Sequence, residues 1–555
     1  MPVCLETKKS NCKNCYKCIR HCPVKSLKFT DGQAHIIREE CVLCGECYVV
    51  CPQNAKRIRN DIEVAKELVK SNDVYVSLAP SYAAKYPNVS LSKISEALSK
   101  IGIKGAFETS EGAAIVKTEY EKLVKKGEMN IIISSCCHSV NTLIEKHYPD
   151  AVKYLAPVVT PMYAHATEIK KMHEGAKVLF VGPCISKKDE ADKSGGVVDC
   201  VLTFNEFDAW LASENITFEE FDSSKITHKT NAFPTSGGIL KSMDLQKDFK
   251  YIVVDGMENC IKTLDNIEES GLKNCFIEMS ACEQSCINGP DMRRERRNPI
   301  VDFMNVDKMY GEDEFDFTPI DGKTDKKFVF DGMKKSMPGS NAIEEVLRQM
   351  GKESRADELN CGSCGYNTCR EKAVAVLMGK ADMTMCLPYL MEKAESFSDI
   401  VIGNTPNGII VIDEQLNIQQ INKSAKKILN LPDYADVVGS PIVRVLDPVD
   451  YLIAADEGKN VYDNKKYLAQ YQKYVEETII CNKKYKIITI MLKDVTAEEE
   501  ERNLKEEKSK AAVEITDKVV EKQMRIVQEI ASLLGETTAE TKIALTKLKE
   551  TLSDE

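Results

Sequence analysis

The chain has 555 residues, a formal net charge of −11 and 22 cysteines. This length predicts several domains, and the negative charge argues against a nucleic-acid-binding protein. No apolar run approaches the roughly 20 residues that span a bilayer, and the first residues do not resemble a signal peptide. We therefore expect a cytoplasmic protein, in which so many thiols favour iron–sulfur chemistry over disulfides.

Residues 1–60 contain two copies of the run Cys-x2-Cys-x2-Cys-x3-Cys-Pro. This run is typical of bacterial ferredoxins with two 4Fe-4S clusters, in which the fourth cysteine of each run serves the other cluster. A zinc site needs only four thiols and does not explain a doubled run ending in Cys-Pro. We predict two clusters, one on Cys12, Cys15, Cys18 and Cys51 and the other on Cys41, Cys44, Cys47 and Cys22.

After a short polar helix expected at 61–72, several apolar, strand-like runs follow within a domain predicted at 73–335. One run leads into Pro80-Ser81, and another, 251–256, is expected to be a buried parallel strand. Side chains at the carboxyl ends of parallel strands converge on the ligand crevice of an open α/β sheet. We therefore expect one cofactor where three further runs end, at Cys136-Cys137, at Cys184, and at Cys282 with Cys286.

These three segments resemble the H-cluster motifs of iron-only (FeFe) hydrogenases. The segments are Ser134-Ser135-Cys136-Cys137-His138, Gly182-Pro183-Cys184-Ile185-Ser186-Lys187-Lys188, and the stretch from Glu278 to Gly289 that contains Cys282 and Cys286. The resemblance implies a 4Fe-4S cluster held by Cys137, Cys184, Cys282 and Cys286. Cys286 would also bridge this cluster to a two-iron unit with CO, cyanide and a bridging dithiolate, which separate maturation proteins supply.

The resemblance also implies roles for residues around the two-iron unit. Cys136 would carry protons, because the pKa of a thiol is tunable, and Glu119 would continue that relay. Pro80-Ser81 would lie against a cyanide, and Lys187 would hydrogen-bond one, as suits a compact donor-only ammonium. Each of the last three assignments has a structural alternative. Glu119 could be an exposed helix carboxylate, Pro80-Ser81 an ordinary strand-to-loop turn, and Lys187 a solvated surface lysine.

Three positions depart from the family pattern. His138 stands where catalytic members have Pro, and Gly182 and Ser280 stand where they have Met. Gly and Ser make the pocket looser and more polar, and an imidazole beside Cys136 could bias that thiol. The iron ligands are intact, whereas their surroundings tune potential and rate. We therefore expect a working cofactor with low turnover.

A third cysteine module is predicted at 340–395. Its spacing looks like that of a small 4Fe-4S domain found in corrinoid-linked proteins, and zinc stays open as an alternative. The ligands would be Cys361, Cys364, Cys369 and Cys386.

The remaining sequence changes character. Residues 397–495 resemble a PAS domain, for which an empty relay domain and a flavin site both stay open. Residues 496–555 are charged and helical, and Val513, Val520, Val527 and Leu534 recur every seven residues. That spacing indicates a coiled-coil seam, and hence a homodimer, with a solvated helix as the alternative.

The predicted fold class is a multidomain chain of α/β and α+β modules. Three functions compete. The first is a sensory hydrogenase that oxidises H2 reversibly and relays its redox state through 4Fe-4S clusters to the PAS domain, the C-terminal helix and a downstream kinase or phosphatase. The second is a metabolic hydrogenase with a soluble electron carrier. The third is an electron-transfer or assembly protein without the two-iron unit, against which Pro80-Ser81, Lys187 and Cys136 argue.

Overall fold

The computed structural model describes residues 3–8, 11–218, 227–295, 297–315, 324–333, 337–432 and 436–553. Parts of the domain expected at 73–335, and the first two residues of the chain, lie outside the described residues. The chain divides into two compact units, Met1–Leu390 and Met391–Glu555. The predicted multidomain class of α/β and α+β modules is confirmed by the sheets and helices of these units.

The ferredoxin-like module opens the first unit with two small antiparallel sheets. β1 (Leu5–Thr7) pairs with β4 (Lys56–Ile58), and β2 (Leu27–Thr30) pairs with β3 (Gln33–Ile36). Each cysteine run contains one short helix, α1 (Lys17–Arg20) or α2 (Glu46–Val49). The pairing of β1 with β4 closes the module, because its first and last strands lie side by side.

Two parallel sheets follow, where we expected one open sheet. One has the strand order β6-β5-β8-β9 and the other has the order β10-β11-β7. Their strands are β5 (Val74–Leu78), β6 (Gly105–Glu108), β7 (Ile131–Ile133), β8 (Lys177–Gly182), β9 (Cys200–Thr203), β10 (Lys250–Asp255) and β11 (Cys275–Ser280). The strand ends that carry the predicted ligands therefore come from both sheets: β7 and β11 lie in one and β8 in the other.

Burial differs between central and edge strands. Val74, Val76 and Leu78 of β5 are fully buried, as parallel strands covered on both faces require. β10, which we expected to be buried, is an edge strand on which Val253 is 42 % exposed. The expectation of burial was wrong, because an apolar run does not report whether a second strand lies beside it.

Helices surround both sheets. The two longest are α6 (Ser110–Lys126) and α8 (Pro161–Met172), followed by α7 (His138–His147), α10 (Phe204–Ser213) and α3 (Ile62–Ser71), which have ten residues each. α3 is the short polar helix expected before the first parallel strand. The others are α4 (Tyr82–Lys85), α5 (Leu91–Ser99), α9 (Ser186–Asp192), α11 (Gly238–Ser242), α12 (Met257–Asp265), α13 (Pro290–Arg294) and α14 (Pro299–Asp307).

The third cysteine module ends the first unit. It consists of α15 (Ser340–Gln349), a cysteine-containing loop, and α16 (Cys369–Leu377). α17 (Leu387–Asn404) starts directly after Cys386 and runs across the boundary between the two units.

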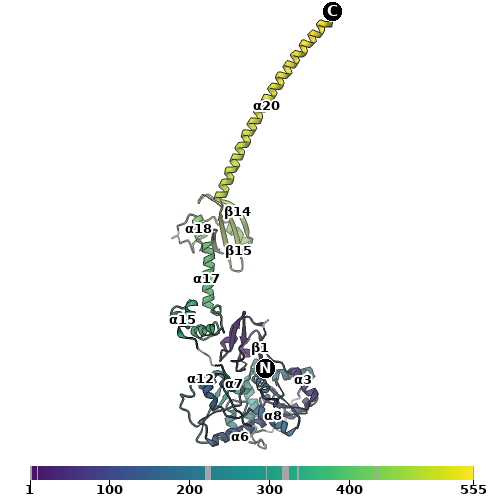
Figure 1. The fold of residues 1–555 in the computed structure, drawn as a ribbon, viewed down its shortest axis with the longest axis vertical. Helices are drawn as coiled ribbons and strands as arrows, with labels where there is room; N and C mark the ends of the chain where they lie inside the picture. Colours follow the sequence, from purple (N-terminus) through teal and green to yellow (C-terminus); the bar gives the residue numbers. More distant parts are fainter. Residues whose placement is uncertain are drawn as a thin grey trace. The chain divides into compact units, whose positions relative to one another are not determined.

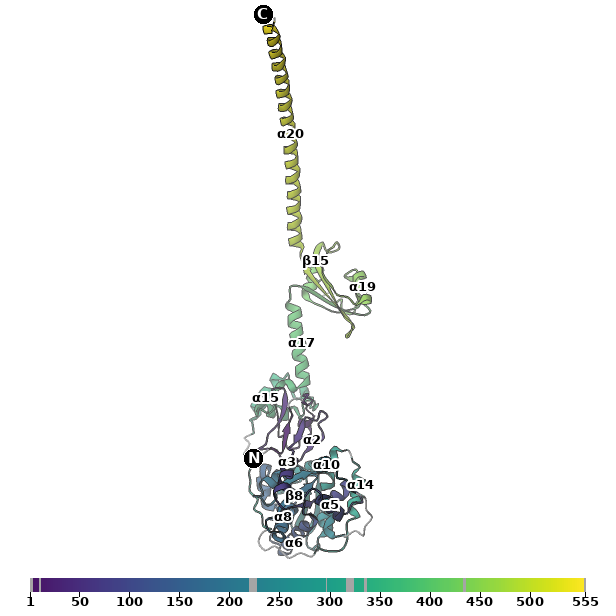
Figure 2. The same cartoon turned by 90° about the vertical axis from the view of Figure 1, so that its right-hand side faces the viewer.

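The second unit contains a five-stranded antiparallel sheet with the order β13-β12-β16-β15-β14. α18 (Lys423–Ile428) and α19 (Val449–Glu457) accompany it, and Figure 2 shows α19 beside β15. This is the architecture expected for the PAS-like segment. The strands are β12 (Gly408–Asp413), β13 (Ile418–Ile421), β14 (Val461–Leu468), β15 (Lys473–Asn482) and β16 (Ile487–Asp494).

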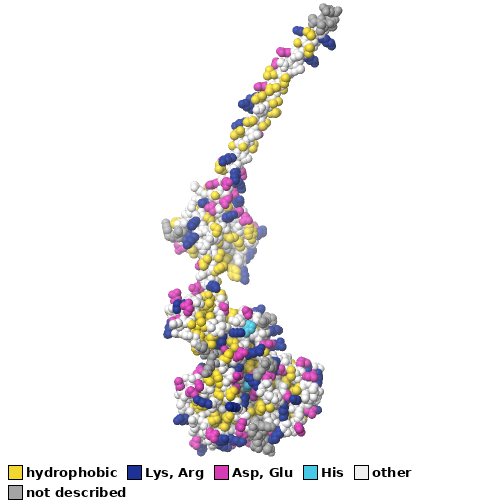
Figure 3. Space-filling view, viewed as in Figure 1, with side chains coloured by type: hydrophobic (Ala, Val, Ile, Leu, Met, Phe, Trp, Pro, Cys, Tyr) yellow, Lys and Arg dark blue, Asp and Glu magenta, His cyan; other side chains and the backbone are white. Residues whose placement is uncertain are grey.

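The chain continues as one long helix, α20 (Thr496–Ser553), which Figure 1 shows as a continuous ribbon. Apolar side chains are exposed along it (Figure 3), including those of Val513, Val520, Val527 and Leu534. Across the described residues, no helix combines the length and the apolar character needed to cross a membrane.

Candidate metal-cofactor site

The first two strand ends are brought together by strand pairing. β7 and β11 are parallel neighbours in which Ile133 lies opposite Ile277. The pairing continues beyond the strands, because the N–H of Ser134 donates to the carbonyl of Ile277 (2.9 Å) and the N–H of Met279 donates to Oγ of Ser134 (3.0 Å). The loops that carry Cys137 and Cys282 therefore leave the sheet side by side.

The third strand end reaches the same place from the other sheet. The loop after Cys286 lies so close to Pro183 that a Cβ added at Gly289 would be 2.9 Å from Pro183 Cβ. Pro183 immediately precedes Cys184. Burial raises the pKa of the Cys282 thiol, and the negative charges of Cys184, Cys137 and Cys286 raise it further. The loops that carry the four predicted ligands therefore approach one another.

The thiol of Cys136 contacts a residue that we did not predict. Its Sγ lies 3.2 Å from the hydroxyl of Tyr120, which also accepts a hydrogen bond from the N–H of Ser135 (2.8 Å). Burial raises the pKa of Cys136 to about 12, although the Tyr120 hydrogen bond and the charge of Lys187 oppose that rise. Cys136 is therefore a protonated thiol at neutral pH.

Glu119, the predicted continuation of the relay, faces elsewhere. Its carboxylate pairs with Lys122 at 2.8 Å on the surface of α6. Tyr120, one residue further along α6, is the side chain that points at Cys136. No sequence pattern indicates this contact, because a tyrosine on a helix is ordinarily interpreted as part of the core.

Lys187 is buried and paired. Its ammonium lies 2.7 Å from Glu190 and donates to the carbonyl of Cys136 at 3.4 Å. Burial alone would raise the pKa of Glu190, but the charges of Lys187, His138 and Lys326, together with the hydrogen bond from Lys187, lower that pKa to about 2. The side chain of Lys187 is 12 % exposed, which excludes the solvated-lysine alternative.

Pro80 and Ser81 follow the strand next to β8. Leu78 pairs with Val181, and the N–H of Ala79 donates to the carbonyl of Val181 (2.9 Å), so this turn runs beside the segment that leads to Cys184. Ser81 is fully buried, and its hydroxyl has no partner among the described residues. Such a hydroxyl costs about 1–3 kcal/mol when left unsatisfied. It fits a bound group that offers an acceptor.

The two remaining predicted site residues make local contacts. His138 Nε2 lies 2.8 Å from a carboxylate oxygen of Asp189 on α9, and its buried Nδ1 has no partner among the described residues. Ser280 donates to the carbonyl of Cys282 at 3.3 Å. His138 is therefore held near Cys137, while Ser280 shapes the turn before the first cysteine of its motif.

The other predicted clusters have cavities of their own. One cavity is lined by Cys12, Cys15, Cys18 and Cys51, and a second by Cys22, Cys41, Cys44 and Cys47. A third cavity is lined by Cys361, Cys364, Cys369 and Cys386. No three His, Cys, Asp or Glu side chains within the described ranges close around one metal ion. The ligand sets rest on motif spacing and on these shared cavities.

The ferredoxin-like module lies directly against the loops of the four-cysteine site. Gly45, between Cys44 and Cys47, has φ +77°, and a Cβ there would be 2.5 Å from Pro290 and 3.0 Å from Ile185. Only glycine permits both this backbone conformation and this approach. The loop of one predicted ferredoxin cluster thus touches the residue after Cys184.

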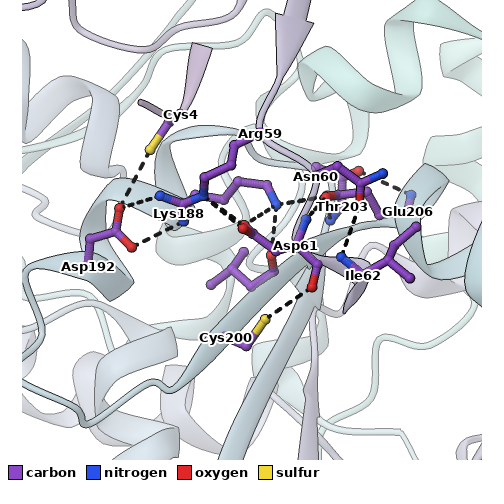
Figure 4. Close-up of polar contacts among 11 residues, drawn as sticks. Cys4, Arg59, Asn60, Asp61, Ile62, Lys188, Asp192, Cys200, Thr203 and Glu206 are labelled. Carbon is purple, nitrogen blue, oxygen red and sulfur yellow. Dashed lines mark hydrogen bonds and ion pairs between the residues drawn. The ribbon is translucent and has the colours of Figure 1, made fainter. Parts of the chain in front are cut away.

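A buried ion network closes the same junction (Figure 4). Lys188 is fully buried, and its ammonium lies 2.8 Å from Asp61 and 2.9 Å from Glu206. Arg59 joins Asp61 (2.8 Å) to Asp192 (2.7 Å). Since Arg59 and Asp61 follow β4 while Lys188 and Asp192 lie on α9, the network ties the ferredoxin-like module to the helix that carries Lys187.

Family comparisons match four segments of the chain. Residues 72–290 match the iron only hydrogenase large subunit, C-terminal domain, and residues 4–52 match the 4Fe-4S dicluster domain. Residues 357–388 match an Fe-S cluster family, and residues 400–470 match the PAS fold. The chain therefore combines an iron-only hydrogenase large-subunit domain with iron–sulfur domains and a PAS domain.

Three curated relatives are 24–26 % identical to the chain. The NADP-reducing hydrogenase subunit HndD of Solidesulfovibrio fructosivorans is 26 % identical over 45 % of the chain and 55 % of that protein. Iron hydrogenase 1 of Clostridium pasteurianum is 24 % identical over 39 % and 49 %. The cytosolic Fe-S cluster assembly factor NAR1 of Encephalitozoon cuniculi is 26 % identical over 30 % and 53 %. The chain spans about half the length of these relatives.

A solved structure, the apo [FeFe]-hydrogenase HydA1 from Chlamydomonas reinhardtii, is 15 % identical. It covers 50 % of this chain and all of that chain, with a TM-score of 0.37.

Proposed function

We propose that the chain is a sensory FeFe hydrogenase. Cys137, Cys184, Cys282 and Cys286 hold the H-cluster, which supplies reversible heterolytic cleavage of H2 when bound. The redox state is relayed through the three further 4Fe-4S clusters to the PAS domain and α20, and from there to a kinase or phosphatase. Turnover is low, and α20 pairs with a second copy of the chain.

The observation that carries the proposal is the set of side chains around the four cysteines. A protonated thiol, Cys136, precedes the ligand Cys137, and a buried ammonium, Lys187, lies on the helix after the ligand Cys184. An unpartnered buried hydroxyl, Ser81, lies in the turn that runs beside the segment leading to Cys184. A 4Fe-4S cluster alone requires none of them. A neighbouring group with anionic acceptors and an exchangeable proton would use all three.

Each of these residues then has a distinct task. Glu190 keeps Lys187 charged and oriented, Ser81 donates a hydrogen bond from a dry position, and Cys136 holds the proton that leaves the site. Tyr120 orients Cys136 through the 3.2 Å contact with its sulfur. The looser pocket expected at Gly182 is not found, because a Cβ added there would be 2.9 Å from the ring of Phe180 and 3.0 Å from Ala79.

The assembly-factor alternative has one observation in its favour, the 26 % identity to a cytosolic Fe-S cluster assembly factor. It predicts that the four-cysteine site holds an iron–sulfur cluster only. Ser81 would then be a buried hydroxyl without a partner among the described residues, which is an expensive arrangement, and Lys187 and Cys136 would have no task beyond their contacts with Glu190 and Tyr120. A metabolic hydrogenase is less consistent with the PAS domain and α20.

The test is hydrogen–deuterium exchange by the matured, anaerobic full chain. We expect exchange in the wild type and a drop of about 10²-fold or more for Cys136→Ala, the range by which general acid–base groups accelerate reactions. Cys481→Ala, which removes a thiol of the second unit, should leave exchange unchanged. Equal exchange by both variants would rule out the role of Cys136, and no exchange by any protein would rule out the hydrogenase.

A further inference from the structure

The third cysteine module, residues 337–390, packs on the ferredoxin-like module within the first unit. The N–H of Phe29 donates to the carbonyl of Lys380 at 2.7 Å, and Lys380 forms an ion pair with Glu40. Arg20 donates to the carbonyls of Gly362 (3.2 Å) and Ser363 (3.3 Å). These contacts attach the loop between Cys361 and Cys364 to the helix that contains Cys18.

Gly365 allows the closest approach at this contact. Its φ is +93°, and a Cβ there would be 3.1 Å from two side-chain atoms of Ile19 and 3.2 Å from the nitrogen of Arg20. Gly365 is adjacent to Cys364, and Ile19 is adjacent to Cys18. The backbone beside one predicted ligand therefore lies on the backbone beside another.

One ammonium connects both sides. Lys25 donates to the carbonyls of Ile19 (3.2 Å) and Arg20 (3.0 Å) in the ferredoxin-like module, and to the carbonyl of Gly365 (3.2 Å) in the third module. Three carbonyls from two modules thus share one cation, which fixes their separation.

Tyr366 lies between the two sets of cysteines. It is 3 % exposed and belongs to one apolar cluster with Cys18, Cys22 and Cys364. Its hydroxyl has no partner among the described residues. A tyrosine hydroxyl ordinarily carries its proton at neutral pH, so this buried hydroxyl offers a free donor at the contact.

We propose that the third module is docked on the ferredoxin-like module as its electron-exchange partner, with Gly365 setting the separation and Tyr366 donating a hydrogen bond to cluster sulfur at the contact. When both modules hold their clusters, this contact would let one electron pass from a reduced ferredoxin-type cluster to an oxidised cluster on Cys361, Cys364, Cys369 and Cys386. The inference rests on the proposed function for the source of the electrons, but the contact itself is independent of hydrogen. This arrangement places the ferredoxin-like module between the four-cysteine site and the third module on the route of the electrons.

The contact is tested by electron paramagnetic resonance of the full chain with its iron–sulfur clusters, reduced with dithionite. We expect line broadening from coupling to the third cluster that is lost in Cys361→Ser, in which only the coupling between the two ferredoxin-type clusters remains. Gly365→Val should reduce this broadening, because its side chain would displace Ile19. Gly379→Ala is the matched control, since Gly379 has φ +67° and nothing within 4 Å of an added Cβ. Broadening that is absent in the wild type, or unchanged in Gly365→Val, would overturn the proposal.

Tyr366→Phe provides a second measurement if Gly365→Val does not fold. Loss of a hydrogen bond to cluster sulfur lowers a reduction potential, so a redox titration should show one cluster shifted to a more negative value while the clusters remain present. Unshifted potentials would overturn the role of Tyr366. Because dithionite replaces hydrogen in both experiments, a failure here is separate from a failure of the proposed hydrogenase.

Discussion

The ferredoxin-like module meets two partners within the first unit, and it meets them in different ways. Toward the four-cysteine site it presents buried charge pairs, of which Lys188 with Asp61 is the most enclosed. Toward the third module it presents mainly cations that bind backbone carbonyls, as Arg20 does with Gly362, together with one buried charge pair, Glu40 with Lys380. Separating a buried ion pair leaves an uncompensated charge and is costly in free energy. A carbonyl that loses a donor at an exposed position can form a hydrogen bond with water instead. The first contact should therefore be permanent and the second one weaker.

Both contacts nevertheless share one structural feature. A glycine with positive φ lies next to or between cysteines, and its missing side chain lets another module approach: Gly45 against Pro290 and Gly365 against Ile19. The overlap that a Cβ would create is larger at Gly45 (2.5 Å) than at Gly365 (3.1 Å). The contact with the site is thus the tighter of the two.

Removal of Lys188 should break the first contact most severely. Lys188→Met leaves the carboxylates of Asp61 and Glu206 buried without their cation, which costs about 3–5 kcal/mol. Chemical denaturation of the full chain measures this loss. Lys70→Met is the control, because Lys70 and Glu67 are both 73 % exposed and lie 3.9 Å apart. Equal stability of both variants would show that the network does not hold the modules.

Gly45→Ala should have the next largest effect. The added Cβ meets Pro290, and positive φ is unfavourable for alanine, so we expect a loss of about 2–3 kcal/mol. Gly127→Ala isolates the backbone contribution, since Gly127 has φ +64° and open space around an added Cβ. The difference between the two variants in a urea titration measures the packing. An equal loss of stability in the two variants would mean that the junction accommodates the added Cβ without a packing cost.

Glu278, in the strand that leads to Cys282, should make the stability of the first unit depend on pH. It accepts hydrogen bonds from the N–H groups of Gly237 (2.9 Å) and Leu240 (3.0 Å), yet burial raises its pKa from 4.5 to about 7. Its contribution to stability is therefore complete below pH 4.5 and is lost as pH rises through 7.

Between pH 6 and 8 the wild type should thus lose about 1 kcal/mol relative to Glu278→Gln, given 1.36 kcal/mol per unit of pKa shift. Unfolding free energies of both proteins at the two pH values test this, with Glu128→Gln at an exposed position as control. A constant difference between wild type and Glu278→Gln would contradict the assignment.

Arg20→Met should have the smallest effect, on the weaker contact. It removes two hydrogen bonds to carbonyls from an exposed side chain, for which we expect a loss of about 0.5–1.5 kcal/mol. Protease cleavage between the modules should increase while the stability of the remaining first unit stays the same. A loss as large as that of Lys188→Met would remove the distinction between the two contacts.

The sequence predicts the cysteine sets from their spacing within the two runs, and these sets stay a prediction. Cys51 lines a cavity with Cys12, and Cys22 lines one with Cys41, as the doubled run implied. The order of strands could not be predicted in the same way. Two sheets replace the single one that we expected, because hydrophobic runs define strands and not their neighbours.

Contacts of the side chains around the site could likewise be predicted only where the residues are close in sequence. Lys187 was predicted from its position three residues after Cys184. It lies in the first turn of α9, which begins directly after the loop that carries this ligand. Tyr120 was missed, because its contact with Cys136 joins a helix to a strand end and leaves no pattern in the sequence. The contact of Gly365 with Ile19 was missed for the same reason: it spans two modules far apart in the chain.

The most direct test of the central claim is an infrared spectrum of the matured protein in the CO and cyanide stretching region, recorded under nitrogen and then under hydrogen. The account predicts bands under nitrogen that shift under hydrogen, because the four-cysteine site holds a reactive two-iron unit. Absence of bands, after maturation has been verified on a control hydrogenase, would contradict it and leave an iron–sulfur protein without hydrogen chemistry.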